Sequence, residues 1–457
     1  MRRLAVVAVC AGVFVSCGSD DDAAETADTT ATAETATADT TATAETTAPA
    51  AEVISEECAI PKPASDVAAD VMGWEFPIVT QYSKELKECE AGGYAFNVQF
   101  LDSAEAQSQI TLDLETGKPT YEIVQGSNDF IAELGNKGLL TPLNDLVEKY
   151  KEQYKLDQIP QSIWDLMSVD GNIYAVPLVS NTQNVFYNEA IFTELGLTVP
   201  TTFDEAIAQC KTLIDAGYGG FHLNLAADWA WQIEFDNVLG SLGVKPLDPE
   251  TGAPNFTGAE GLKAAETLAT LVKECGGKTI GTYSSDDIQN AFQTGEFAIG
   301  QVWASRAAAM DDAEATKPEV LGKMQFAPAL STGGSILAAP AYADGYGIPK
   351  GTEADVEALF LAILAAGDEE SQTAAAAFGA VTRTGVTNAE GPRNGEAALT
   401  SASQGRGPDQ SHPAAGIYRA EIGKALVKIL DGGDPAALLA EAEAAYTAEA
   451  KKQGLIS

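Results

Sequence analysis

The chain alternates short runs of apolar, β-branched and aromatic residues with longer segments in which apolar side chains recur every three or four positions. In the first part of the chain, the short runs predict a strand that ends at Trp74 and strands at residues 94–101 and 121–124. The longer segments predict helices over residues 77–89 and 103–114. Such alternation is typical of an α/β fold.

The same alternation continues along the rest of the chain. A turn signal at residues 170–171 precedes a predicted strand at 172–177, and a second strand follows at 184–188. Residues 201–205 combine a capping threonine with early acids, which predicts the start of a helix. Further helices are expected through Cys210 and over residues 262–275, 354–366 and 435–453.

Polar residues follow the ends of two predicted strands in the first part of the chain. Residues 125–129 are expected to form a polar loop after the strand at 121–124, with the next helix beginning at Ile131. Ligands in open α/β sheets bind beyond the carboxyl ends of the strands. The candidate ligand-binding residues in this part of the chain are Trp74, Glu75, Gln125, Asn128 and Asp129.

The N-terminus has the pattern of an export signal. Arg2 and Arg3 precede an apolar run at residues 4–15, which is too short to span a bilayer as a helix. Phe14-Val15-Ser16-Cys17 resembles a bacterial lipobox, which implies cleavage of residues 1–16 and lipidation of Cys17. The alternative is an ordinary signal peptide with an incidental cysteine.

A low-complexity segment of Ala, Thr, Asp and Glu occupies residues 20–51. It has no aromatic residue and no apolar period, so it cannot bury enough surface to offset the entropy of ordering. We therefore interpret residues 17–57 as a lipidated cysteine followed by a disordered tether.

The net charge is −39, and residues 1–57 hold 11 acids and 2 bases, which leaves −30 for the rest of the chain. This acidity argues against a nucleic-acid partner, because a phosphate backbone requires a basic surface. It also argues against docking on an anionic membrane surface. The two histidines leave little room for histidine-rich metal sites or histidine-dependent triads.

Besides Cys10 and Cys17, the chain has four cysteines, at positions 58, 89, 210 and 275. Export makes disulfides the expected state, and four cysteines allow three pairings. We favour Cys58–Cys89 and Cys210–Cys275, each within one lobe of the fold; the alternative is free buried thiols.

Enzyme motifs are absent or incomplete. Residues 276–279 imitate the end of a phosphate-binding loop, but Val272 stands where that loop requires glycine. Acid pairs such as Asp228 and Glu234 could serve a glycosidase, although chance pairs are certain in so acidic a chain. No catalytic residue, metal ligand or cofactor is assigned.

Aromatic residues near carboxylates give a clearer signal. Aromatic faces stack on the C–H faces of sugars, and carboxylates and amides pair with their hydroxyls. The alternative for any one tryptophan is an ordinary core position. The candidates are Trp229, Trp231, Trp303, Tyr342, Asp344 and Tyr346.

Several segments together resemble the family 1 extracellular solute-binding proteins of ABC transporters. They are Gly138-Leu139-Leu140-Thr141-Pro142-Leu143, the strand at residues 171–177, the stretch at 186–205 with Tyr187-Asn188 and Pro200-Thr201-Thr202-Phe203, and residues 292–299 followed by Trp303. The resemblance covers most of the chain beyond the tether.

The resemblance implies a two-lobed periplasmic-binding-protein fold of type II, with ligand held between α/β lobes that close on it. The first lobe would comprise residues 58–180 and 345–395, and the second residues 181–344 and 396–457. The chain would cross between the lobes near residues 178–184, 341–347 and 392–400.

The family also implies a function, binding without chemistry. The expected ligand is a sugar, oligosaccharide or polyol, and the expected partners are ABC permease subunits, with a monomeric protein anchored by lipid to the outer face of the cytoplasmic membrane. Arg383 resembles an arginine turn of the family but lacks its proline, and Tyr418 would enter the cleft from the C-terminal part. The alternatives are a binding protein for a polyamine or peptide and, less favoured, a secreted glycoside hydrolase.

Overall fold

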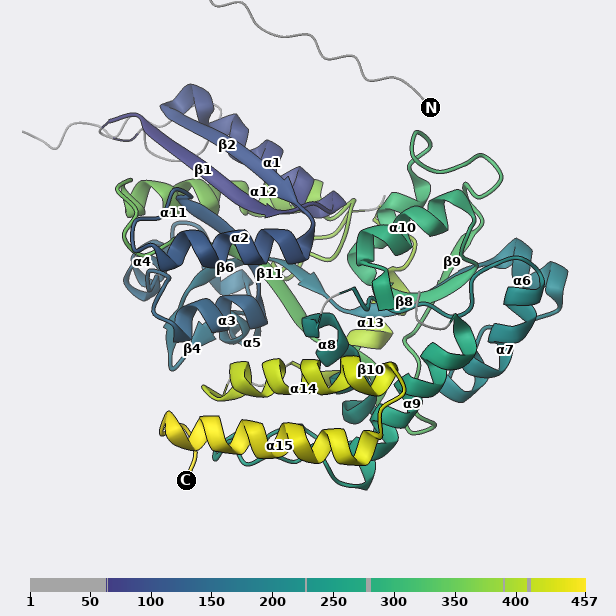
Figure 1. The fold of residues 1–457 in the computed structure, drawn as a ribbon. Coiled ribbons are helices and arrows are strands. Elements are labelled where there is room, and N and C mark those ends of the chain that lie inside the picture. Colours follow the sequence, from purple (N-terminus) through teal and green to yellow (C-terminus); the bar gives the residue numbers. More distant parts are fainter. Residues whose placement is uncertain (1–62, 64, 227, 277–280, 389–390, 409–411) are drawn as a thin grey trace, which may run out of the picture. The chain divides into compact units, whose positions relative to one another are not determined.

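The computed structural model describes residue 63 and residues 65–457 except 227, 277–280, 389–390 and 409–411. The expected signal peptide, Cys17, the tether and Cys58 lie outside the described residues. Figure 1 shows the order of the elements along the chain.

A five-stranded sheet forms the centre of the first lobe, in the order β2-β1-β3-β11-β6. β1 pairs in parallel with β2 and β3, whereas β11 runs antiparallel to both β3 and β6. The strands are β1 (Val67–Trp74), β2 (Tyr94–Leu101), β3 (Ile123–Ser127), β6 (Ala175–Asn181) and β11 (Tyr342–Gly347). A strand from late in the chain therefore lies between two strands from its first half.

Helices bury their apolar side chains against this sheet. α1 packs against α11 and α12, while α2 and α3 contact the strands β1, β3 and β11 (Figure 1). Residues 358–366 of α11 are all buried, as expected for so apolar a helix, and Asp355 caps its start. The helices of this lobe are α1 (Pro77–Glu88), α2 (Ser103–Glu115), α3 (Asn128–Asn136), α4 (Asn144–Tyr150), α5 (Gln161–Leu166), α11 (Val356–Ala366) and α12 (Glu369–Ala375). The hairpin β4 (Ser168–Val169) and β5 (Asn172–Ile173) and the 3₁₀ turns η1 (Cys89–Gly92) and η2 (Leu156–Gln158) complete it.

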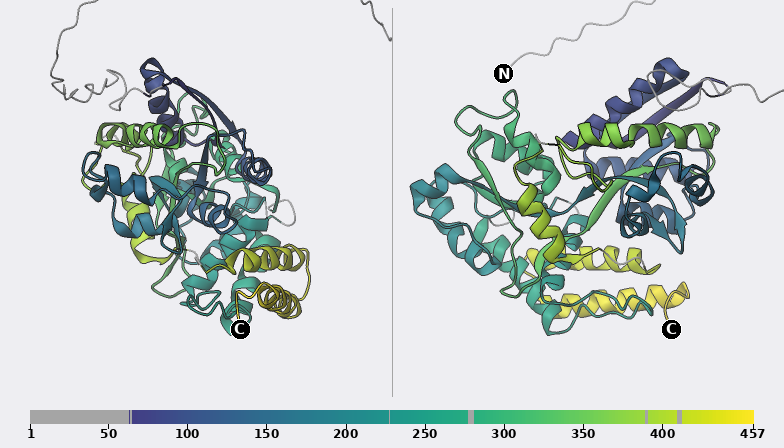
Figure 2. Two further views of the ribbon diagram at one scale, coloured as in Figure 1. Left: turned by 90° about the vertical axis from the view of Figure 1, so that its left-hand side faces the viewer. Right: turned by 180° about the vertical axis from the view of Figure 1, so that it is seen from behind.

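The second lobe has a smaller antiparallel sheet, in the order β8-β7-β9, with helices around it. α14 and α15 lie side by side and pack on α8 and α9 (Figures 1 and 2). The strands are β7 (Gln183–Asn188), β8 (Ile299–Trp303) and β9 (Met324–Ala327). The helices are α6 (Glu189–Leu195), α7 (Phe203–Asp215), α8 (Asp228–Ser241), α9 (Ala259–Cys275), α10 (Ser285–Thr294), η4 (Ala304–Asp311), α13 (Gly395–Gln404), α14 (Ala415–Leu430) and α15 (Pro435–Lys452).

The chain leaves the five-stranded sheet, and later returns to it, through single residues. Thr182 separates β6 from β7, and Ala341 separates β10 (Leu337–Pro340) from β11. β10 pairs in parallel with β12 (Gly405–Gly407). Because β6 ends at Asn181 and β11 begins at Tyr342, residue 181 and residues 342–344, which are expected in the second lobe, belong to the first sheet.

The expected polar loop at residues 125–129 is wrong, because all five residues belong to a strand or a helix. Residues 125–127 belong to β3, where Gln125 pairs with Tyr346 of β11, and α3 starts at Asn128 rather than Ile131. The polar residues extend the strand because a distant strand supplies their backbone partners.

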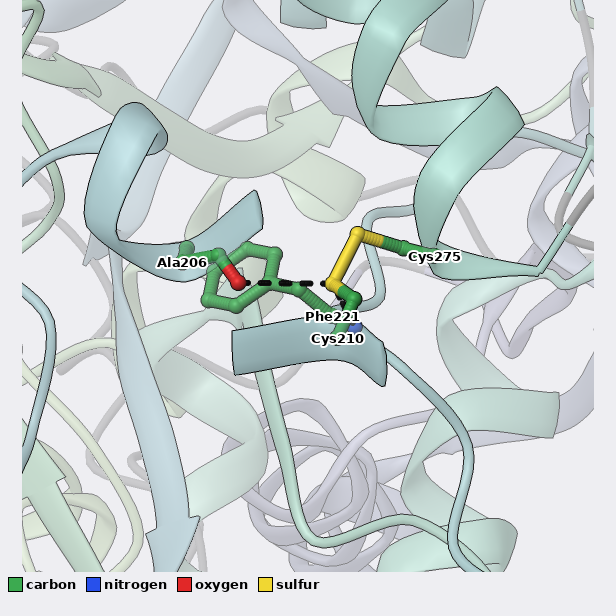
Figure 3. The surroundings of a disulfide bond; sticks show 4 residues. All are labelled: Ala206, Cys210, Phe221 and Cys275. Atoms are coloured by element: carbon green, nitrogen blue, oxygen red, sulfur yellow. Dashed lines mark hydrogen bonds between the residues drawn. A yellow bond between two sulfur atoms is a disulfide. The ribbon is translucent and has the colours of Figure 1, made fainter. Parts of the chain in front are cut away.

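A disulfide joins Cys210 of α7 to Cys275 of α9, as the sequence predicts, and the amide of Phe221 donates a hydrogen bond to the Cys210 sulfur (Figure 3). Free thiols are therefore excluded at these two positions. Cys89 is also disulfide-bonded; its expected partner Cys58 lies outside the described residues, so that pairing stays a prediction.

Candidate ligand-binding cavity

A cavity of about 50 Å³ lies between the two lobes, and we call it the inner cavity. From the first lobe and its crossing strands it is lined by Trp74, Phe76, Ser103, Gln107, Ser127, Asp129, Asn181, Tyr342 and Asp344. From the second lobe it is lined by Trp229, Ile233, Ser285, Trp303, Ser305 and Arg306.

Aromatic rings from both lobes face this cavity. Trp74 ends β1, and its backbone amide donates to the side-chain oxygen of Gln125 at 3.0 Å, which fixes the end of the strand. Trp303 ends β8 and packs edge-on against Tyr342 with ring centroids 5.0 Å apart. Trp229 comes from the first turn of α8. Aromatic side chains from both lobes therefore contribute to the lining.

Asp344 of β11 is a fully buried carboxyl group in the cavity wall. Burial, and secondarily the charge of Asp129, raise the pKa of Asp344 to about 7, although a hydrogen bond with Asn181 opposes the shift. Near neutral pH this group exists in both protonation states, so it can accept a hydrogen bond or donate one to a ligand hydroxyl.

Asp129 is oriented from both lobes. The Ser127 hydroxyl of its own lobe donates to one carboxylate oxygen at 2.5 Å. From α14 of the second lobe, Arg419 donates to the Asp129 carbonyl oxygen at 3.1 Å and lies 3.8 Å from the other carboxylate oxygen. This arrangement couples a cavity-lining carboxylate to the contact between the lobes.

Arg306 is a buried guanidinium at the edge of the cavity. It donates to Asp286 at 2.5 Å and to Gln289 at 3.1 Å, both on α10, and its guanidinium carbon lies 5.8 Å from the centre of the Phe76 ring. Desolvation of the Asp286 carboxyl outweighs the Arg306 charge, so the pKa of Asp286 is raised. The ion pair and the aromatic contact together fix the position of Arg306.

A hydrogen bond across the crossing segment connects the lobes beside the cavity. The Asn181 amide donates to the Ser305 hydroxyl at 3.1 Å, and both residues line the cavity. The amide of Thr182 in turn donates to the Asn181 side-chain oxygen at 3.0 Å. A ligand that contacts Asn181 would therefore touch the segment that joins β6 to β7.

The structure brings six of the expected ligand-binding residues to the inner cavity and leaves seven outside its lining. Those that line it are Trp74, Asp129, Trp229, Trp303, Tyr342 and Asp344. Those that do not are Glu75, Gln125, Asn128, Trp231, Tyr346, Arg383 and Tyr418.

Three of the seven lie beside the inner cavity: two accept hydrogen bonds from backbone amides next to it, and one lines an adjoining cavity. The Gln125 side chain holds the end of β1, and the Asn128 side-chain oxygen accepts from the Ala343 amide at 3.1 Å, which joins α3 to β11. Glu75 borders a second cavity beside the first. Gln125 and Asn128 therefore hold in place two strands that carry lining residues.

The other four are buried within a lobe. Trp231 and Tyr418 belong to the second-lobe core, where the Tyr418 hydroxyl donates to Asp236. Tyr346 belongs to the first-lobe core. Arg383 donates to the carbonyl oxygens of Gly367, Tyr154 and Lys155 and to the Gln158 side chain, at 2.8–3.0 Å. These contacts bind segments of one lobe together.

Nine lining residues were not among the sequence candidates. Ser103 and Gln107 follow the end of β2, so the rule that found Trp74 would have found them. Arg306 lies three residues after Trp303, but no sequence signal shows that Asn181, Ile233, Ser285 or Ser305 point inward. The remaining two are Phe76 and Ser127.

The described part of the chain contains no cluster of His, Cys, Asp and Glu side chains arranged to hold a metal ion. Among the same residues, no helix has the length and apolar character needed to cross a bilayer.

Comparison with known proteins places these features in a family. A sequence model of bacterial extracellular solute-binding proteins matches residues 73–370. A mannitol-binding protein of Pseudomonas aeruginosa is 26% identical over 199 residues, which are 42% of this chain and 44% of that protein. The α-glucosides-binding periplasmic protein AglE of Rhizobium meliloti is 30% identical over 128 residues, 26% of this chain and 27% of that protein. The matched stretches thus span less than half the length of these curated relatives.

Solved structures match over most of the chain. A solute-binding protein of Agrobacterium vitis with bound D-mannitol has a TM-score of 0.72 at 20% identity and covers 85% of this chain and 99% of its own. Maltose-bound MalE3 of T. maritima has a TM-score of 0.68 at 19% identity and covers 85% of this chain and 100% of its own. At these identities the likeness shows a shared fold.

Proposed function

Since the chain belongs to the bacterial extracellular solute-binding proteins and has their two-lobed type II periplasmic-binding-protein fold, as the sequence predicted, we propose that it captures a sugar or polyol for an ABC importer. The inner cavity is the proposed binding site. The protein would bind its solute and release it unchanged to membrane permease subunits.

The lining of the inner cavity is the observation that carries this proposal. Trp74, Trp229 and Trp303 supply ring faces on which sugar C–H groups stack, and four serines, two amides and two carboxylates supply partners for hydroxyls. Relatives whose names or bound ligands include mannitol and maltose agree with this chemistry.

Closure of the lobes would trap the ligand. Asn181, Tyr342 and Asp344 lie on the crossing strands, so a ligand that contacts them together with Trp229 or Trp303 bridges the two lobes at the hinge. A ligand shifts the equilibrium between open and closed forms only through contacts that differ between them. Contacts to both lobes meet that condition.

We also propose that residues 1–16 are removed and that lipid on Cys17 anchors the protein, as a monomer, at the outer face of the cytoplasmic membrane. The tether would then keep the binding lobes near the permease. Replacing Cys17 with Ser should release the protein from the membrane fraction; a protein that stays membrane-bound would contradict lipidation.

A cationic solute such as a polyamine is the second candidate. The carboxylates of Asp129 and Asp344 both line the cavity. Among the described lining residues the cationic one is Arg306, and it forms an ion pair with Asp286. A polyamine would use these carboxylates and would gain little from three tryptophans and four serines. Spermidine therefore belongs in any ligand screen beside the carbohydrates.

The test is a titration with polyols, monosaccharides, maltose and spermidine, in which binding is measured by tryptophan fluorescence and by calorimetry. We expect saturable binding of at least one carbohydrate and a loss of about tenfold in affinity, about 1.4 kcal/mol, for Trp303→Ala. Trp164, a first-lobe core residue, gives the control variant Trp164→Phe, which should keep wild-type affinity. Saturable binding of spermidine with no carbohydrate bound would replace the sugar proposal.

A further inference from the structure

A second, larger space adjoins the inner cavity, and we call it the outer cavity. It measures about 700 Å³, whereas the inner cavity measures about 50 Å³. The two linings share two residues, Phe76 from the first lobe and Arg306 from the second. These two side chains therefore stand between the spaces, and we call them the partition.

The partition is held firmly on both sides. The Arg306 side chain is 6% exposed and is fixed by Asp286 at 2.5 Å and Gln289 at 3.1 Å. Phe76 is 4% exposed and directly precedes Pro77, whose ring restricts the backbone at the start of α1. The guanidinium carbon lies 5.8 Å from the centre of the Phe76 ring, within the range of a cation–π contact. Moving Arg306 would leave the partly buried Asp286 without its counter-ion.

The two cavities differ in chemistry as well as size. Three tryptophans line the inner cavity, whereas the described lining of the outer cavity has none and includes the charged residues Lys84, Asp311 and Arg393. Rings that stack on sugars are thus confined to the inner side of the partition.

We propose that the Phe76–Arg306 partition limits the length of the ligand, so that the inner cavity takes one sugar unit or an acyclic polyol. This inference rests on the proposed function and narrows it. A longer oligosaccharide must displace Arg306 to extend into the outer cavity, and it loses the contacts of Arg306 with Asp286, Gln289 and Phe76 when it does so. Arg306 and Phe76 are therefore the residues that determine specificity for ligand length.

Affinities for D-mannitol, D-glucose, maltose and maltotriose test the proposal. The wild-type protein should bind a one-unit ligand at least tenfold more tightly than maltotriose. In Arg306→Ala that difference should shrink by at least tenfold, and Arg306→Lys should lie between the two. Phe76→Leu should shift the preference in the same direction by a smaller factor. Tighter binding of maltotriose by the wild-type protein, or an unchanged preference in Arg306→Ala, would overturn the proposal.

Arg393 supplies a matched control. It too pairs with one carboxylate, Asp311 at 2.7 Å, and lies over one aromatic ring, that of Phe326 at 5.4 Å, but it lines the outer cavity alone. Arg393→Ala should therefore keep the preference for short ligands. A loss of length preference equal to that of Arg306→Ala would show that any enlargement of the outer cavity suffices, and would refute the partition.

A second measurement needs no ligand. Acrylamide quenching of tryptophan fluorescence reports access to Trp74, Trp229 and Trp303, so Arg306→Ala should raise the quenching constant and Arg393→Ala should not. Unchanged quenching in Arg306→Ala would overturn the partition even if carbohydrates bind. Raised quenching with no carbohydrate bound by the wild-type protein would retain the partition and reject the proposed function.

Discussion

Arg306 and Arg383 are both about 95% buried, one in each lobe, and they differ in what their guanidinium groups bind. Arg383 is surrounded by carbonyl and amide oxygens of its own lobe, and all its described partners are structural. Arg306 contacts a carboxylate of its own lobe and an aromatic ring of the other. Both arginines are buried charges, but only Arg306 of the two contacts the opposite lobe, and that contact is what distinguishes the cavity wall from the interior of a lobe.

Two tryptophans repeat the contrast within one helix. Trp229 and Trp231 lie two residues apart on α8, which turns them to different sides of the helix. Trp229 lines the inner cavity, and Trp231 packs in the second-lobe core. The cavity wall and the core behind it thus use the same residue types, so a single substitution in each region can separate their roles.

The largest expected effect is on the core side. Trp231→Ala should lower the free energy of unfolding by about 3–5 kcal/mol, because it leaves a large void in a packed core. Denaturant unfolding measures this loss, and ligand affinity of the folded protein should change little. Trp229→Ala should show the reverse. Equal losses of ligand affinity in the two variants would contradict the assignment of Trp229 to the cavity wall and Trp231 to the core.

The next effect concerns the cavity wall and depends on pH. The pKa of Asp344 is about 7 in the folded protein and about 3.8 when unfolded, so below pH 4 the group carries no penalty. As the pH rises from 4 to 7, the unfolded chain loses this proton first and the wild-type protein loses stability. Asp344→Asn should remove that loss, with an advantage over wild type that grows with pH to at most about 4 kcal/mol. Thermal unfolding at pH 4, 5.5 and 7 measures it.

The comparison of wild type with Asp344→Asn isolates one carboxyl group. Burial also raises the pKa of Glu234 to about 7, but Glu234 is present in both proteins and its contribution cancels. A stability difference that does not change between pH 4 and 7 would mean that Asp344 is ionised in the folded protein throughout.

Arg383→Ala should come third, with a loss of about 2–4 kcal/mol in the free energy of unfolding, because it strands several buried oxygen atoms. Binding should persist in the folded protein, and Arg383→Lys should recover part of the stability. If Arg383→Ala lost ligand binding but kept its stability, Arg383 would be a ligand-binding residue like Arg306, and the proposed difference between the two arginines would be wrong.

The smallest effect is expected where the two regions touch. Arg419→Gln removes the contact of α14 with Asp129, so we expect ligand affinity to fall by about 0.5–1 kcal/mol, roughly two- to fivefold. Lys424→Gln removes the same charge from the same helix, where Lys424 pairs with Glu421 at 2.7 Å, and should leave affinity unchanged. Calorimetry on both variants tests whether the location of the charge matters.

Local patterns predicted the elements well. The strand at residues 94–101, the helix over residues 103–114 and the start of α7 behind Thr202 all appear, because periodicity and capping depend on near neighbours. The two-lobed fold followed from the family resemblance. The polar residues 125–127 were misread, because their strand depends on β11, which lies more than 200 residues away.

The site was predicted less completely. Rules about strand ends found Trp74 and Asp129, but they could not tell which face of α8 or which end of β11 meets the gap. Tyr342 and Asp344 line the cavity while Tyr346, on the same strand, is buried in the core. The packing of the two lobes decides which of these side chains reach the cavity, and no local sequence pattern predicts that packing.

The insertion of β11 between β3 and β6 has a consequence for how the protein is made. The first-lobe sheet lacks its link between these two strands until residues 342–347 have been synthesised. A nascent chain shorter than this leaves two strand edges and their apolar neighbours unsatisfied, so the first lobe cannot complete folding early. A product truncated before β11 should aggregate or be degraded.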